Sequence, residues 1–175
     1  MKQLNSIYTK WDSGDVRLTW NSNMEFSKGA IFTSVHAVCI KNGHILLTHI
    51  LNRGFHFPGG HIETGEKLEQ ALHREAYEEG YVKGELRYLG AIEVSHEENP
   101  LFDRNGKYPL VGYQAFYRLD VTECLPFLRE YEATARIWVE PSEVPFVMND
   151  HGLATEILRE ALVMGEPILI ERMVE

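Results

Sequence analysis

The chain has 175 residues, of which 44% are apolar and 25% charged, so it is long enough to build one compact core. Its 17 Lys and Arg against 26 Asp and Glu give a net charge of −9, which argues against a nucleic-acid groove or an anionic membrane surface as partner. No apolar run approaches the roughly 20 residues of a membrane helix, and the isolated Cys39 and Cys124 fit a reducing cytoplasm.

The first third of the chain predicts strands. Residues 1–28 are expected to form an N-terminal extension with one short strand at 16–20. Apolar and β-branched residues predict strands at 32–40 and 44–50, joined by a hairpin turn at Asn42-Gly43 because both turn residues tolerate positive φ. The segment GFHF that follows also has strand character and leads into Pro58-Gly59-Gly60.

Helix and strand signals then alternate. Residues 67–79 lack Gly and Pro and predict a helix that Gly80 ends. Strands are predicted at 85–95, 110–121 and 137–140, and Glu143-Val-Pro predicts a turn. Apolar residues at helical spacing predict a second helix at 151–164, with a buried face of Leu153, Ile157, Leu158 and Leu162. This order predicts one α/β domain over residues 1–175, with a mixed sheet and helices packed on its faces.

The first predicted helix carries acidic residues on its apolar face. At about 100° per residue, Glu75 and Glu79 lie within about 20° of Leu68, and Glu78 flanks them. Adjacent buried carboxylates cost several kcal/mol per charge unless something compensates them. A divalent cation would do so, and carboxylate oxygens favour Mg²⁺ or Mn²⁺ over Zn²⁺. The alternative is a solvated acidic face with Arg74 paired to Glu78, and helix geometry alone leaves both open.

The glycines before this helix favour the binding interpretation. Glycines at 59, 60 and 65 permit close backbone approach to a ligand and leave carbonyl oxygens free for a metal. No Lys-Ser or Lys-Thr follows them, which excludes a phosphate loop of the G-x-x-x-x-G-K-[ST] type, and no G-x-G-x-x-G dinucleotide motif is present. The turn and helix together therefore point to a metal-assisted site.

From Gly60 to Val82 the chain resembles the box of the Nudix hydrolases, G-x5-E-x7-R-E-U-x-E-E-x-G-U, where U is bulky and apolar. The residues at the required spacing are Gly60, Glu66, Arg74, Glu75, Glu78 and Glu79. There are two departures: the small Ala76 stands at a U position, and Tyr81 stands at the second glycine. Either Tyr81 replaces that glycine at the helix end, or Gly80 takes over its role.

The resemblance implies an α/β/α Nudix sandwich and metal-dependent cleavage of a pyrophosphate bond in a nucleoside diphosphate-linked substrate. It implies Mg²⁺, with Mn²⁺ as the second choice, bound by Glu75 and Glu79 with support from Glu78 and the Gly59 carbonyl. Arg74 is expected to orient these glutamates, and Glu66 to contact the site from the start of the helix. The substrate-binding residues are expected to include Phe57, Gly59 and Gly60.

The general base is left open between a box glutamate and four outside candidates: Glu97, Glu98, Glu130 and Glu132. Glu132 ranks first among these because the strand predicted at 137–140 can return it to the site. Four aromatic residues are candidates for stacking on a base, with strand-core positions as the alternative: Phe55, Phe57, Tyr81 and Tyr113. His36, on an apolar strand, is expected to be a core residue, and the spacing of His56 and His61 does not predict zinc.

Several functional alternatives fit the same motif. RGFHFPGG resembles the approach to the box in members that remove oxidised nucleoside triphosphates, while nucleotide sugars, dinucleotides and ADP-ribose are the other substrate candidates. A catalytically silent nucleotide-binding module is the non-enzymatic alternative, and the presence of all four box glutamates argues against it. The sequence leaves open whether the molecule is a homodimer.

Overall fold

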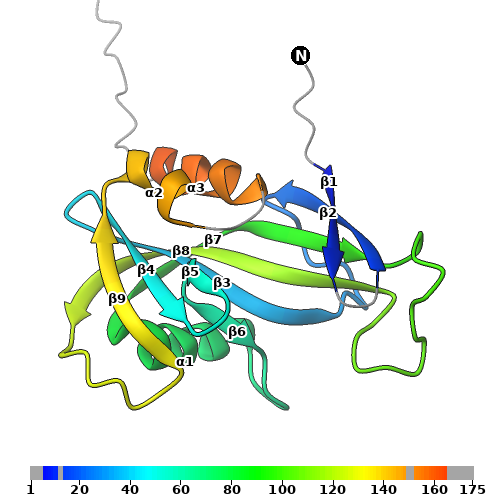
Figure 1. Ribbon diagram of the computed structural model, residues 1–175, viewed down its shortest axis with the longest axis horizontal. Coiled ribbons are helices and arrows are strands. Elements are labelled where there is room, and N and C mark those ends of the chain that lie inside the picture. The colour runs from blue at the N-terminus through cyan, green and yellow to red at the C-terminus, as the bar shows by residue number, and fades with distance from the viewer. Residues whose placement is uncertain (1–5, 12–13, 149–151, 165–175) are drawn as a thin grey trace, which may run out of the picture.

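A mixed β-sheet between helices makes up the fold, in a computed structural model that describes residues 6–11, 14–148 and 152–164. Helix α1 (Leu68–Gly80) covers one face of the sheet, and α2 (Val144–Val147) and α3 (Leu153–Val163) cover the other (Figure 1). The predicted α/β/α sandwich is confirmed. Within the described residues, no helix is long and apolar enough to cross a membrane.

The described residues contribute nine strands to one sheet. These are β1 (Ser6–Trp11), β2 (Gly14–Ser22), β3 (Phe32–Lys41), β4 (His44–Ile50), β5 (Gly54–His56), β6 (Gly59–His61), β7 (Val82–Ser95), β8 (Val111–Cys124) and β9 (Ala133–Val139). Their order is β1-β2-β7-β8-β3-β4-β5, with β6 paired to β3 and β9 to β4. Strands β3 and β8 are parallel at the centre, and the long connection between them contains α1 and β7.

The hairpin between β3 and β4 forms where the sequence predicts it. Asn42 and Gly43 have φ values of 50° and 76°, and Lys41 pairs with His44 across the turn. Positive φ at both turn residues matches the twist of the flanking strands, which explains the preference for Asn-Gly. The hairpin fixes the pairing of β4 with β3. Strand β5 then pairs with β4, and β6, which contains the glycines at 59 and 60, returns to pair with β3.

The N-terminal segment differs from the expectation. Residues 1–28 were expected to be an extension with one strand, but β1 and β2 form a hairpin that continues the main sheet through β7. Val16, Leu18 and Trp20 alternate into the core, each at most 1% exposed. This alternation of buried and exposed residues explains why β2 could be predicted. Strand β1 has no comparable apolar face, so the sequence pattern did not predict it.

Other element limits need correction. The predicted turn at Glu143-Val-Pro is a 3₁₀ turn (Pro141–Glu143) followed directly by α2. Proline is tolerated at helix starts because its missing N–H would have no partner there. The proline of Glu143-Val-Pro therefore lies in the first turn of α2 and does not interrupt the helix. The predicted helix at 151–164 is α3 from Leu153 onward; His151 lies outside the described residues. Strand β9 begins at Ala133, earlier than predicted.

Helix α3 is fastened to the N-terminal hairpin by one carboxylate. Trp20 Nε1 donates a hydrogen bond to Glu160 Oε1 at 2.9 Å, and Ser22 Oγ donates to Glu160 Oε2 at 2.7 Å. The Trp20 ring is 1% exposed and packs edge-on against Phe116. Glu160 therefore fixes the helix on the sheet through two donors, one of which belongs to a buried indole.

We expect Glu160→Ala to lower the free energy of unfolding by about 1–3 kcal/mol, because the Trp20 indole loses its acceptor. Urea denaturation measures this change. Arg159→Ala on the same helix, which removes only an exposed pair with Glu156, is the control and should cost less than about 0.5 kcal/mol. An equal effect of the two variants would contradict the prediction.

Candidate active site

Helix α1 places acidic side chains on the face that packs against the sheet. Ala71, Leu72 and Ala76 are buried on this face, and Glu79 is buried with them at 5% exposure. The side chains of Glu75 and Glu78 are 13% and 32% exposed. The helical-wheel prediction is therefore confirmed for Glu75 and Glu79, and a fully solvated acidic face is excluded.

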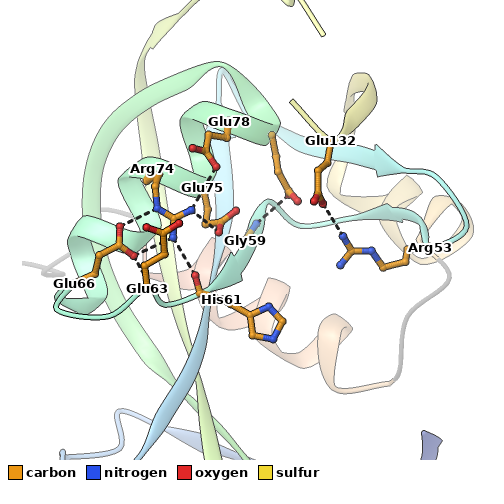
Figure 2. Close-up of polar contacts among 10 residues, drawn as sticks. Arg53, Gly59, His61, Glu63, Glu66, Arg74, Glu75, Glu78 and Glu132 are labelled. Atoms are coloured by element: carbon orange, nitrogen blue, oxygen red, sulfur yellow. Dashed lines mark hydrogen bonds and ion pairs between the residues drawn. The ribbon is translucent and has the colours of Figure 1, made fainter. Parts of the chain in front are cut away.

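Arg74 ties three of the four box glutamates together (Figure 2). Its Nε donates to Glu66 Oε1 at 2.8 Å, and its Nη1 donates to Glu75 Oε1 at 2.7 Å and Glu78 Oε2 at 3.3 Å. Nη2 also donates to the His61 carbonyl at 3.0 Å. The bond from Arg74 lowers the pKa of Glu66 to about 2, so this carboxylate stays ionised. One guanidinium thus fixes the helix relative to strand β6.

Glu79 is held differently, by neutral donors alone. The Gly59 N–H donates to Glu79 Oε2 at 3.1 Å, and Thr48 Oγ1 donates to the same atom at 3.3 Å. No ion pair to Glu79 occurs within the described residues. Burial raises the pKa of Glu79 to about 7, the Gly59 bond opposes this shift, and the charge of Glu75 adds to it. Burial likewise raises the pKa of Glu75.

The two glycines of the turn let the backbone approach these carboxylates. A Cβ at Gly59 would lie 2.2 Å from the Val35 carbonyl oxygen, and a Cβ at Gly60 would lie 2.5 Å from Glu75 Oε1. Any side chain at either position would displace a central strand or a box carboxylate. The sequence predicts that the backbone of this turn approaches another group closely. The structure shows that Gly59 approaches strand β3 and that Gly60 approaches the Glu75 carboxylate.

These groups line an acidic cavity of about 570 Å³. Its walls are Arg53, Gly59, Gly60, His61, Glu63, Arg74, Glu75, Glu78, Glu79, Tyr131 and Glu132. Of the four outside candidates for the general base, Glu132 alone lines this cavity, where it pairs with Arg53 at 3.3 Å (Figure 2). Glu97 and Glu98 instead pair with Arg17. Glu130 is outside the lining.

A second cavity of about 800 Å³ adjoins the first and has a different chemistry. We call it the aromatic cavity, because rings dominate its walls: Trp11, Phe55, Phe57, Phe102, Tyr108 and Phe116. Among the described residues, no Asp or Glu lines it, whereas Arg53 and Lys107 do. Arg53, Gly59, Gly60 and His61 belong to both cavities. A bound molecule can therefore extend from the carboxylates into an aromatic, carboxylate-free space.

The histidine and aromatic expectations are borne out unevenly. His36 was expected in the core but is half-buried in the wall of the aromatic cavity, stacked on Phe116 at 5.0 Å. Phe55 and Phe57 line this cavity, whereas Tyr113 does not. The sequence correctly places His36 on strand β3. It does not show that the sheet face on which His36 lies borders a cavity at this point, where a covering helix would make His36 a core residue.

Tyr81 resolves the departure from the box. Helix α1 includes Gly80, and Tyr81 follows it in the left-handed conformation, with φ 52° and ψ 40°. Its N–H donates to the Tyr77 carbonyl at 2.9 Å, as a helix-ending residue does. Tyr81 therefore replaces the glycine. For a residue other than glycine this conformation costs about 1–2 kcal/mol, and Tyr81 is also 2% exposed, so it does not stack on a ligand.

Several residues of the site were missed by sequence reasoning. Arg53, at the junction of the cavities, and Thr48, on Glu79, stand near the box but match no spacing rule. Trp11 comes from the N-terminal hairpin, and Lys107 and Tyr108 come from the loop between β7 and β8. Only the fold brings these segments to the glycine turn. The signal that the sequence offers for Arg53 is its position directly before GFHF and the glycine turn.

Among the described residues, no three His, Cys, Asp or Glu side chains converge on one point closely enough for a metal shell. Arg74 holds the Glu75 and Glu78 oxygens, while Glu79 has no cationic hydrogen-bond partner in that part of the chain. The donor set consists of carboxylate oxygens at a glycine-bounded cavity, which suits Mg²⁺ or Mn²⁺. The site therefore fits a hard divalent cation, provided that the carboxylates adjust.

Comparison with known proteins agrees with this geometry. A family model described as NUDIX domain matches residues 31–159. The putative 8-oxo-dGTP diphosphatase YtkD of Bacillus subtilis (strain 168) is 42% identical over 65 residues, which span 37% of this chain and 41% of that relative. The chain belongs to the Nudix family, as the resemblance of its sequence to the Nudix box predicts.

Solved structures show the same fold. The crystal structure of the Bacillus subtilis pyrophosphohydrolase BsRppH has a TM-score of 0.68 and 21% identity, covering 91% of this chain and 98% of that one. The NUDIX domain of Shewanella oneidensis NrtR, complexed with ADP ribose, has a TM-score of 0.56 and 20% identity, covering 77% and 90% of the two chains. At these identities the likeness establishes the architecture.

The raised pKa of Glu79 predicts a stability cost at high pH. The folded-state value of about 7 lies above the ordinary 4.5, so between these values the folded protein binds more protons than the unfolded chain. The free energy of unfolding should therefore fall as pH rises from about 4.5 through 7. Without divalent ions at pH 8, Glu79→Gln should be more stable than wild type by on the order of 2 kcal/mol, and the difference should vanish near pH 4.

Urea denaturation in EDTA across this pH range measures the difference, with Glu69→Gln on the exposed face of α1 as control. Added Mg²⁺ should stabilise the wild type and leave Glu79→Gln nearly unchanged, because ligand binding stabilises only a fold that binds it. A Glu79→Gln protein less stable than wild type at pH 8 would show that the buried charge is fully compensated.

Proposed function

We propose that the protein is a metal-dependent hydrolase that cleaves a pyrophosphate bond in a nucleoside diphosphate-linked substrate. The observation that carries this proposal is the buried carboxylate of Glu79, which lies beside Glu75 and has only neutral hydrogen-bond donors. An anion in this setting needs a cation. A divalent ion meets this need and also offsets the charge of a diphosphate, so an acidic cavity can accept an anionic substrate.

Glu75, Glu78 and Glu79 would hold the cation, together with the Gly59 carbonyl. Bound there, Mg²⁺ or Mn²⁺ would polarise the phosphoryl oxygens and lower the pKa of a water ligand. Arg74 restrains Glu75 and Glu78 through hydrogen bonds from one Nη1 atom, which limits the motion of their carboxylates. Glu66 anchors Arg74 from the start of the helix and therefore acts through it.

Arg53 is the cation best placed for the substrate itself. It lines both cavities, and its side chain is 59% exposed, so it can turn from Glu132 toward a phosphate. The guanidinium suits phosphate oxygens because its planar N–H groups can donate in pairs. Arg53 would thus hold the diphosphate at the boundary between the two cavities, with the carboxylates on one side and the rings on the other.

The aromatic cavity would hold the nucleoside part of the substrate. Phe55 and His36, both half-buried, offer ring surface for a base, whereas Phe57 is buried in the same wall. The absence of carboxylates from the described lining avoids repulsion of nearby phosphates. A nucleoside triphosphate, with an oxidised base as one candidate, is the preferred substrate class. The name of the B. subtilis relative, a putative 8-oxo-dGTP diphosphatase, supports this choice, and the match to that relative covers 65 residues. Nucleotide sugars and dinucleotides are the alternative, since the cavity exceeds one base.

Glu132 is the proposed general base outside the box. It faces the acidic cavity beside the box carboxylates, and its charge acts on Glu75. From there it can accept a proton from the attacking water while the water's oxygen bonds to phosphorus. The bond from that phosphorus to the bridging oxygen breaks, and the bridging oxygen leaves with the electron pair on the departing phosphate group. A cytoplasmic location, inferred from the isolated cysteines, belongs to the same proposal.

We expect hydrolysis of at least one member of a panel of nucleoside triphosphates, nucleotide sugars and dinucleotides in Mg²⁺ or Mn²⁺, and none in EDTA. Glu79→Gln should lower kcat on the order of 10²-fold or more, because a direct metal ligand is lost. Phosphate or pyrophosphate release measures the reaction, and Glu69→Gln is the matched control. Nucleotide binding without turnover on the whole panel would favour the catalytically silent module.

The role of Glu132 is tested by Glu132→Gln against Glu97→Gln. The first should lower kcat on the order of 10²-fold, as expected for loss of a general base, while the second should leave kcat unchanged. Mn²⁺ affinity, followed by electron paramagnetic resonance, should stay close to wild type in both. A loss in Glu97→Gln with none in Glu132→Gln would reverse the assignment.

A further inference from the structure

Tyr81 occupies the position of the second glycine of the box, and it keeps a left-handed backbone there despite its side chain. Its φ is 52°, and its side chain is almost fully buried. A glycine would end the helix in the same conformation without strain. The helix end therefore does not require a tyrosine, and the ring and hydroxyl of Tyr81 make contacts that a glycine could not make.

The hydroxyl and backbone of Tyr81 hold the segment between β8 and β9. Its Oη accepts a hydrogen bond from the Glu130 N–H at 2.8 Å, and its carbonyl accepts one from the Leu125 N–H at 2.8 Å. Its ring contacts Phe127 at 5.3 Å and Tyr131 at 6.0 Å between centroids. One residue thus fixes both ends of segment 125–131 against the end of helix α1.

Arg136 strengthens the same joint. Its Nη1 donates to the Gly80 carbonyl and to the Leu125 carbonyl, both at 2.9 Å. Its guanidinium also lies over the Phe127 ring at 5.4 Å. The last helical carbonyl and the start of the segment are therefore joined twice, once through Tyr81 and once through Arg136.

The held segment delivers two residues to the acidic cavity. Tyr131 directly follows the hydrogen-bonded Glu130, and Glu132 follows Tyr131; both line the cavity together with Glu75, Glu78 and Glu79. The Tyr131 ring also contacts Tyr77 of helix α1 at 6.2 Å. Movement of the Glu130 amide would therefore shift this wall of the cavity relative to the box carboxylates.

We propose that Tyr81 is a positioning residue, which holds segment 125–132 so that Tyr131 and Glu132 face the carboxylates of helix α1. This inference rests on the proposed function, since it assigns Tyr81 to the geometry of that reaction. Restoring the glycine of the box should consequently impair the enzyme, even though glycine removes the backbone strain. A role limited to ending the helix predicts the opposite outcome.

The test uses Tyr81→Phe, which removes only the hydroxyl, and Tyr81→Gly, which also removes the ring. The control is Tyr88→Phe, because the buried Tyr88 hydroxyl has no hydrogen-bond partner in the described structure. Tyr81→Phe should lower kcat on the order of 10-fold with KM changed less than about twofold, since small misplacement of a reacting group is costly. Tyr81→Gly should lose at least as much, and Tyr88→Phe should match wild type.

Two further measurements separate positioning from simple stability. Hydrogen–deuterium exchange of residues 126–132 should speed up in Tyr81→Phe while exchange in α1 stays slow. In a Glu132→Gln background, Tyr81→Phe should add little further loss, because the group it positions is gone. Full kcat in a folded Tyr81→Gly protein, or a loss that is fully additive with Glu132→Gln, would overturn the inference.

These outcomes differ from failure of the proposed function. If the wild type hydrolyses no substrate but Tyr81→Phe speeds exchange in the segment, Tyr81 does hold the segment and the proposed hydrolase function is wrong. If the wild type is active and exchange is unchanged in Tyr81→Phe, the proposed hydrolase function stands and the positioning role of Tyr81 is wrong.

Discussion

The burial of an acidic side chain, Glu79, is the constraint on which the rest of the site depends. Helix α1 must pack its apolar face on the sheet, and Glu79 lies on that face. Its oxygens then need donors from the sheet side, which the Gly59 amide and Thr48 provide. The close fit of Gly59 against β3, where a Cβ would lie 2.2 Å from the Val35 carbonyl, follows from the same packing.

Charge is divided sharply between two neighbouring spaces. One cavity is lined by Glu75, Glu78 and Glu79, of which Arg74 holds the first two. The other is lined by rings and cations, with no Asp or Glu among its described wall residues. Arg53 and His61 stand where they meet. Under the proposed function, this division lets a chain of net charge −9 accept an anionic substrate, because the acidic groups of the site lie where the cation would bind.

The box and its helix could be predicted because their spacing and periodicity are local properties. Glu75 and Glu79 on the inner face follow from the helical repeat alone, and the turn at Asn42-Gly43 from backbone preference. Residues contributed by distant strands could not be predicted, since nothing local marks Trp11 or Lys107 as neighbours of the glycine turn. The choice between Gly80 and Tyr81 also needed the structure, because it depends on φ and on a buried hydroxyl that binds a later loop.

The N-terminal hairpin adds to the site a residue from outside the region that the family model matches. Strand β1 carries Trp11 to the wall of the aromatic cavity, yet it lies outside residues 31–159, which the family model matches. Under the proposed function, the metal-binding carboxylates and part of the substrate-contacting wall therefore come from separate stretches of the sequence. Under that proposal, a substitution at Trp11 would change the wall of the aromatic cavity while every box carboxylate is retained.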